Sequence, residues 1–79
     1  MLSCTISSDN QTKQYKNLEG ISLPSFRGQA QILSGHAESF MLLRAGSIFF
    51  RKGERMEKVM DIKGGEGYVN KDEVVVVLD

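Results

Sequence analysis

The sequence has few of the residues from which cross-linked and metal-bound scaffolds are built. Among its 79 residues are one cysteine, one histidine, one proline and no tryptophan. A single cysteine excludes an intramolecular disulfide framework and a zinc site made of thiolates. A single histidine could hold a metal only with carboxylates or thiols that the fold brought to it. We therefore expect no metal and no cofactor, and a reducing compartment.

The sequence also lacks net charge and long apolar runs. Ten basic residues balance ten acidic ones, so no overall field attracts nucleic acid or anionic lipid. No segment approaches the roughly 20 apolar residues of a spanning helix, and the N-terminus lacks the apolar run of a signal peptide. These absences predict no nucleic-acid partner and no direct insertion into a membrane.

What is present is ordinary for a soluble globular domain. Apolar residues make up 41% of the chain and charged residues 25%. A chain of this length can bury one hydrophobic core, with only about 60% of the unfolded surface removed from water. We expect a single domain over residues 1–79.

Short apolar segments recur between turn residues at intervals of about 8–12 residues, which is typical of sandwiches and barrels. Pro24 cannot donate to a strand ladder, so it marks a strand end or an edge strand. The sequence predicts an all-β fold, a two-sheet β-sandwich of about nine or ten short strands. The clearest expected strands are residues 2–6, 37–43, 47–50, 56–62 and 74–78, of which 37–43 is the only run that could also pass for a helix.

Five segments carry finer predictions. In the strand over 56–62, Met56, Met60 and Ile62 share one parity, which predicts a mostly buried side. The run 74–78 is apolar on both parities, so we expect cover on both of its faces or nearly so. The glycines within 64–67 indicate a close-packed crossing. The runs 40–43 and 49–50 are expected in the core, although part of this set could surface as a partner patch.

Few residues could carry chemistry. Ser34 and His36 share a strand parity and could pair, but nothing nearby resembles a nucleophile elbow or an oxyanion loop. We expect His36 to be satisfied by local hydrogen bonds or to lie in an interface. The glycines at 64–67 lead into a strand and include Glu66, which would repel phosphate. Cys4 is expected to be a small core residue. The sequence predicts no catalytic site.

Between Glu19 and Asp79 three features follow one another in order: EGISLPSFRGQAQILSGHAESFMLL, Arg44-Ala45-Gly46 and IKGGEGYVNKDEVVVVLD. In this order they resemble the epsilon subunit family of F-type ATP synthases, specifically its N-terminal β-sandwich domain. Any one of these glycine motifs alone would be weak, and together in register they are far more specific. The sequence departs from the family at Ser34 and Glu38, where prolines are usual, and at Gln29, where an acidic residue is common.

The resemblance implies a nonenzymatic rotor component of the central stalk. Such a component would bind the gamma subunit, dock it to the membrane c-ring and so couple proton translocation to ATP synthesis. It would lie peripherally on the inner face of an energy-transducing membrane. By position, Arg27, Gly28 and Gln29 would face the c-ring, and Ser8, His36 and Met41 would face gamma. Up to Asp79 nothing matches the family's helical hairpin, so its ATP binding and braking are not expected here.

Two other functions remain open at this point. One is a free-standing β-sandwich adaptor that binds a ligand or peptide. The other is a small hydrolase that uses Ser34 and His36.

Overall fold

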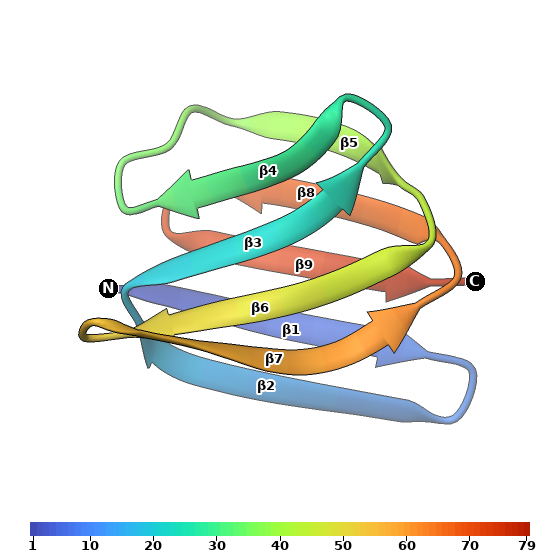
Figure 1. Cartoon of the computed structure of the whole chain (residues 1–79), viewed down its shortest axis with the longest axis horizontal. Helices are drawn as coiled ribbons and strands as arrows, with labels where there is room; N and C mark the ends of the chain where they lie inside the picture. The colour runs from blue at the N-terminus through green and yellow to red at the C-terminus, as the bar shows by residue number, and fades with distance from the viewer.

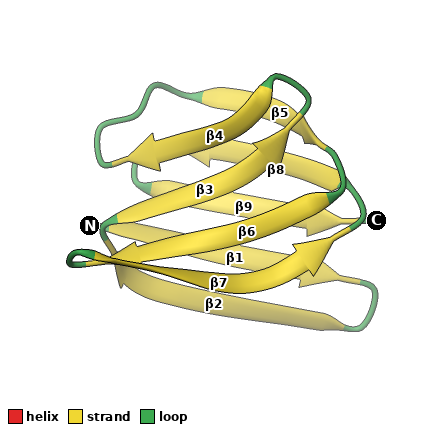
Figure 2. Cartoon of the chain, viewed as in Figure 1, coloured by secondary structure: helices red, strands yellow, loops and turns green.

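The computed structural model describes residues 1–79 and consists of strands joined by short turns, with no helix (Figures 1 and 2). None of its elements is a helix that could span a membrane. The all-β prediction is confirmed, and the number of strands lies within the expected range. The nine strands are β1 Leu2–Ser8, β2 Gln11–Leu18, β3 Gly20–Ser25, β4 Gly28–Leu33, β5 Ser39–Leu43, β6 Gly46–Lys52, β7 Arg55–Ile62, β8 Gly65–Asn70 and β9 Glu73–Leu78.

The strands form one hydrogen-bonded sheet that curls into two facing layers (Figure 1). The back layer has the order β2-β1-β9-β8-β5 and the front layer the order β4-β3-β6-β7. They are continuous along one side, where Ser25 of β3 pairs with Leu43 of β5. On the other side β2 and β7 are edge strands that do not pair. The predicted sandwich is therefore confirmed, with its two sheets joined along one side and open along the other.

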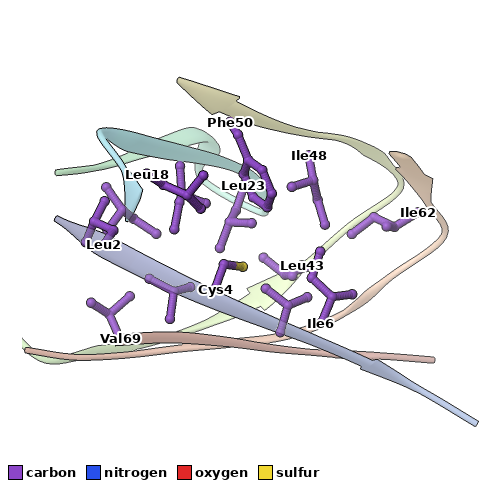
Figure 3. Packing of buried hydrophobic residues seen from close by; sticks show 14 residues of the cluster. Leu2, Cys4, Ile6, Leu18, Leu23, Leu43, Ile48, Phe50, Ile62 and Val69 are labelled. Carbon is purple, nitrogen blue, oxygen red and sulfur yellow. The ribbon is translucent and has the colours of Figure 1, made fainter. Parts of the chain in front are cut away.

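The core lies between the two layers because alternate residues of each strand point inward. In β1, for example, Leu2, Cys4 and Ile6 are buried while the residues between them are not. Figure 3 shows Ile48 and Phe50 of the front layer pointing toward the back layer. Each buried aliphatic or aromatic side chain contributes about 1.5–3 kcal/mol by leaving water. The buried cluster is Leu2, Cys4, Ile6, Leu18, Ile21, Leu23, Ile32, Leu43, Ile48, Phe50, Ile62, Val69, Val74 and Val76.

The prediction of one mostly buried side in residues 56–62 is wrong for Met56, whose side chain is 48% exposed. The cause is a β-bulge in β7. Ile48 of β6 pairs with Met60 and the next residue, Phe49, pairs with Lys58, so Val59 has no partner. An extra residue reverses the inward and outward parity beyond it. Met60 and Ile62 therefore face the core, whereas Met56 faces outward.

The prediction that β9 is covered on both faces is also wrong. Val74 and Val76 are buried, but Val75 is 37% exposed and Val77 is 39% exposed. No third layer packs on the outside of this strand (Figure 1).

The glycine-rich crossing is confirmed. A Cβ on Gly65 would collide with the carbonyl oxygen of Val77, and one on Gly67 would lie 3.2 Å from both Leu23 and Met41. Pro24 lies one residue before the end of β3, as a strand-end proline should. It is not in an edge strand, because β3 pairs with β4 on one side and with β6 on the other.

Candidate interaction surfaces

The outer side of the back layer carries a row of exposed apolar side chains from β5, β8 and β9. Phe40 pairs with Tyr68, which in turn pairs with Val75. The rings of Phe40 and Tyr68 contact each other with centroids 5.1 Å apart. In the parallel row Leu42 and Val77 lie on either side of Glu66. We call this set the apolar face: Phe40, Leu42, Tyr68, Val75 and Val77.

The apolar face is more concentrated than ordinary surface hydrophobicity. It holds five of the nine large hydrophobic side chains that the molecule exposes. Single exposed apolar residues are normal, whereas contiguous patches mark surfaces that bind other proteins or membranes. Phe40 and Leu42, which were expected in the core, are therefore exposed, and the alternative that part of this set forms a partner patch remains a prediction.

The two outer faces of the sandwich differ in the charged residues that they carry. The outward positions of β5, β8 and β9 carry Glu66 and Glu73 and no basic residue. The Tyr68 hydroxyl donates to Glu66 Oε1 at 3.1 Å, and this bond raises the pKa of Tyr68 because it favours the neutral phenol. The apolar face is therefore bordered by acidic groups.

The outer side of the front layer is more polar and carries Arg51, Lys58 and Asp61 beside the exposed Met56. Ser47 Oγ donates to Asp61 Oδ1 at 2.5 Å, and Lys58 Nζ lies 3.3 Å from the same carboxylate. The hydrogen bonds from Ser47 and Lys58, and the charge of Lys58, lower the pKa of Asp61. The Asp61 carboxylate therefore already has hydrogen-bond and ion-pair partners within the front layer.

The turn that connects β3 to β4 brings together Arg27, Gly28 and Gln29. Ser25 Oγ accepts from Arg27 N at 3.2 Å and donates to the Gly28 carbonyl at 2.6 Å, which fixes the turn. Gly28 has φ of 113°, a conformation that favours glycine. Gln29 Nε2 donates to the Ser47 carbonyl at 3.0 Å, so the amide that stands in place of an acid is held against β6.

The same turn adjoins the apolar face. Phe26, which is 68% exposed, forms its tip. A surface hollow of about 430 Å³ lies between Phe26 and Arg27 on one side and the strand from Phe40 to Leu42 on the other. The two surfaces are therefore continuous at this corner of the molecule.

Ser8, His36 and Met41 do not form one patch. Ser8 ends β1, whereas the loop of His36 lies beside Asp72, whose carbonyl accepts from Ser3 N at the start of β1. At about 3.3 Å per residue, the length of β1 separates these two sites by roughly 20 Å. Met41 faces inward, is partly buried against the core and reaches the surface only at the hollow.

His36 is satisfied locally, as expected. Its Nδ1 donates to the Ala37 carbonyl at 2.8 Å, and its backbone N–H donates to the Leu33 carbonyl at 3.1 Å. The ring is thus engaged with its own loop, and no hydrogen bond joins it to Ser34. No group of three His, Cys, Asp or Glu side chains is arranged to hold a metal.

Sequence reasoning did not single out Phe26, Tyr68, Val75 or Val77. The signal was in the sequence, because a two-layer sandwich can cover only one face of each strand. A strand such as β9, apolar on both parities, must then expose half of its side chains.

The fold is thus a two-layer β-sandwich that exposes an apolar face beside an ordered turn. The chain belongs to the family of the ATP synthase delta/epsilon chain β-sandwich domain, whose model matches residues 1–79. No curated protein sequence matches it.

Two solved structures show the same fold. One is from the mitochondrial ATP synthase of Euglena gracilis, solved as its OSCP/F1/c-ring part, with a TM-score of 0.82, 19% identity and 95% of this chain covered. The other is from the central stalk/c-ring of the Tetrahymena thermophila enzyme, with a TM-score of 0.78, 13% identity and 98% covered. This chain spans 48% and 62% of the two matched chains.

Proposed function

We propose that the protein is a nonenzymatic rotor component of an F-type ATP synthase, which binds the gamma subunit and docks it to the c-ring. The observation that carries this proposal is the exposed apolar face with the β3–β4 turn at its corner. Family membership supports it, because the matched domains belong to ATP synthase delta/epsilon chains. In this role the protein sits peripherally on the inner face of the membrane and helps couple proton translocation to ATP synthesis.

The apolar face is the surface we assign to gamma. Phe40, Leu42 and Tyr68 offer large side chains that lose little conformational freedom when a partner covers them, which favours tight binding. Because Glu66 and Glu73 border them, the complementary surface carries basic residues around an apolar centre. Of the positions carried over from the family, Met41 lies nearest this surface.

The β3–β4 turn is the surface we assign to the c-ring. Its hydrogen-bonded geometry presents Arg27 from a rigid base, and Phe26 links it to the apolar face. A sandwich with a close-packed interior transmits force with little compliance. The turn and the face together would let one stiff domain contact both partners. The two structural neighbours come from assemblies that include a c-ring, which supports this assignment.

The gamma assignment is tested by calorimetry with the gamma subunit of the same synthase. Phe40→Ser should weaken binding about tenfold or more, since removing a central aromatic anchor typically costs over 1 kcal/mol. Met56→Ser, which removes a similarly exposed apolar side chain from the opposite face, should bind as the wild type does. Equal affinities for all three proteins would reject the apolar face as the gamma site.

The ring assignment is tested by rebinding to stripped membranes at low and high salt. Arg27→Glu should change ring affinity in a salt-dependent way, because it reverses a charge at the contact. Gln29 stands where an acidic residue is common in the family. An exposed contact between a carboxylate and a cation contributes only about 0–1 kcal/mol to docking, so the wild-type protein should still couple with an amide at this position. Arg51→Glu makes the same charge change on the front layer and serves as the control. If Arg27→Glu leaves membrane binding and proton-coupled ATP hydrolysis unchanged at both salts, the turn does not face the ring.

A further inference from the structure

The open side of the sandwich contains a cavity that neither proposed contact uses. It lies between the unpaired edge strands β2 and β7 and has a volume of about 130 Å³. Figure 1 shows these two strands adjacent in different layers at the lower side of the molecule. The apolar side chains that line the cavity are Ile6, Tyr15, Val59, Met60 and Leu78.

The β-bulge in β7 helps to build this cavity. Because Val59 has no partner in β6, it and the next residue, Met60, both line the cavity instead of pointing to opposite faces. Both side chains are half-buried. Bulges commonly re-aim side chains at functional sites. On the opposite wall, Tyr15 is held by an edge-to-face contact with Phe50, with ring centroids 4.9 Å apart.

The size of the cavity decides what could occupy it. Pockets for metabolites and drug-sized ligands measure about 300–1,000 Å³, so this one is too small for them. A dry engineered cavity of about 150 Å³ accepts a benzene molecule. The volume of 130 Å³ therefore suits one branched aliphatic or small aromatic side chain.

The residues at the rim of the cavity favour a partner that carries a negative charge. Its polar residues are Ser8, Gln11 and Lys13, and no acidic residue lines it. Lys13 pairs with Ile6 in the strand register, so its stem lies on the inward side of β2 while the ammonium can remain in water. Lys13 belongs to neither of the two ion pairs in the structure. A carboxylate beside the inserted side chain would complement it.

We propose that this cavity is a socket for one leucine-like side chain of a partner protein, in a segment that also places a carboxylate against Lys13. The socket is distinct from the apolar face, which lies on the outside of β5, β8 and β9. It does not depend on the assignment of that face to gamma. Such pockets at interfaces hold the few anchor residues that contribute most of the binding energy.

The chemistry of the socket is tested with N-acetyl-leucine, which carries both an isobutyl side chain and a carboxylate. In a methyl-labelled protein, the NMR signals of Ile6, Met60 and Leu78 should shift saturably as this probe is added. The methyl signals of Leu42 and Val75, on the apolar face, should not. N-acetyl-alanine should bind about tenfold or more weakly, because it lacks three apolar carbons. N-acetyl-leucinamide, or the variant Lys13→Gln, should weaken binding about two- to fivefold.

A variant that fills the socket from within provides the second measurement. Val59→Phe should abolish the shifts induced by N-acetyl-leucine while the protein stays folded, as judged by its thermal midpoint and by an unchanged Phe40–Tyr68 signal set. If Val59→Phe does not fold, Val59→Met is the substitute, since its flexible side chain adapts to irregular space. Equal binding of the leucine and alanine probes, shifts centred on Leu42 and Val75, or full binding by a folded Val59 variant would overturn the proposal. Failure of the gamma experiment would leave it intact.

Discussion

Burial alone decides the chemistry of Cys4. The residue is fully buried between the layers, and desolvation of its thiolate raises the pKa to about 12. Because the thiolate is the reactive form, the native thiol is inert near neutral pH. This matches the expectation from the sequence, which contains no cation close to Cys4 that could activate it.

We therefore predict that Cys4 resists alkylation by iodoacetamide at pH 8 in the native protein and reacts rapidly in denaturant. Mass spectrometry of the two samples measures the difference. The same pKa has a second consequence, since the unfolded thiol ionises at lower pH than the folded one. The free energy of unfolding should fall as pH rises from about 9 toward 12. Rapid native labelling would show that Cys4 is accessible.

Asp61 gives the opposite case, an exposed acid controlled by its partners. Its pKa lies below the ordinary value because Ser47 and Lys58 hydrogen-bond to the ionised form. Ser47→Ala should raise that pKa toward the ordinary value, as measured by NMR titration of the carboxyl carbon. The stabilisation from this contact is present at neutral pH and is lost as pH falls through the lowered pKa. An unchanged titration in Ser47→Ala would mean that the Ser47 bond does not form in solution.

At the scale of single elements, the positions of the strands could be predicted from the sequence, but which side chains of a strand face the core could not. The turn residues and apolar segments specified β1, β5, β6, β7 and β9, with errors of only a few residues at their ends. The bulge at Val59 could not be read from parity, because one unpaired residue in β7 depends on how β6 aligns with it. That half of β9 must be exposed follows from a two-layer sandwich, but the apolar run alone does not show that Val75 and Val77 form the exposed half.

The glycine pattern, in contrast, predicted a packing constraint correctly. Gly65→Ala should destabilise the fold by more than about 3 kcal/mol, because the new Cβ would meet the Val77 backbone of the neighbouring strand. Gly53→Ala is the matched control. Both glycines have a positive φ, 155° at Gly65 and 64° at Gly53. A Cβ on Gly53 would meet no other atom, so only a conformational cost of about 1–2 kcal/mol applies there. Urea unfolding of the two variants provides the comparison, and similar losses would contradict the predicted collision.

At the scale of the whole molecule, the protein is a compact block measuring 28 × 23 × 20 Å. Its radius of gyration of 11.2 Å is close to the about 11.6 Å expected for a compact chain of this length. The resemblance in the sequence indicated both proposed partners and, by position, residues for each contact, but it did not indicate the apolar face. Ser8, His36 and Met41 are dispersed over the structure, whereas the apolar face is contiguous. Contiguity arises from strand register across β5, β8 and β9, which the sequence alone does not reveal.

The central claim is that the apolar face is covered in the assembled synthase and the front layer is not. Hydroxyl-radical footprinting of the free protein and of the intact synthase, read by mass spectrometry, tests this directly because it labels exposed aromatic, leucine and methionine side chains. The account predicts that Phe40, Leu42 and Tyr68 become protected in the synthase, while Met56 on the front layer is labelled as in the free protein. Continued labelling of the three apolar-face residues, with protection of Met56, would contradict it.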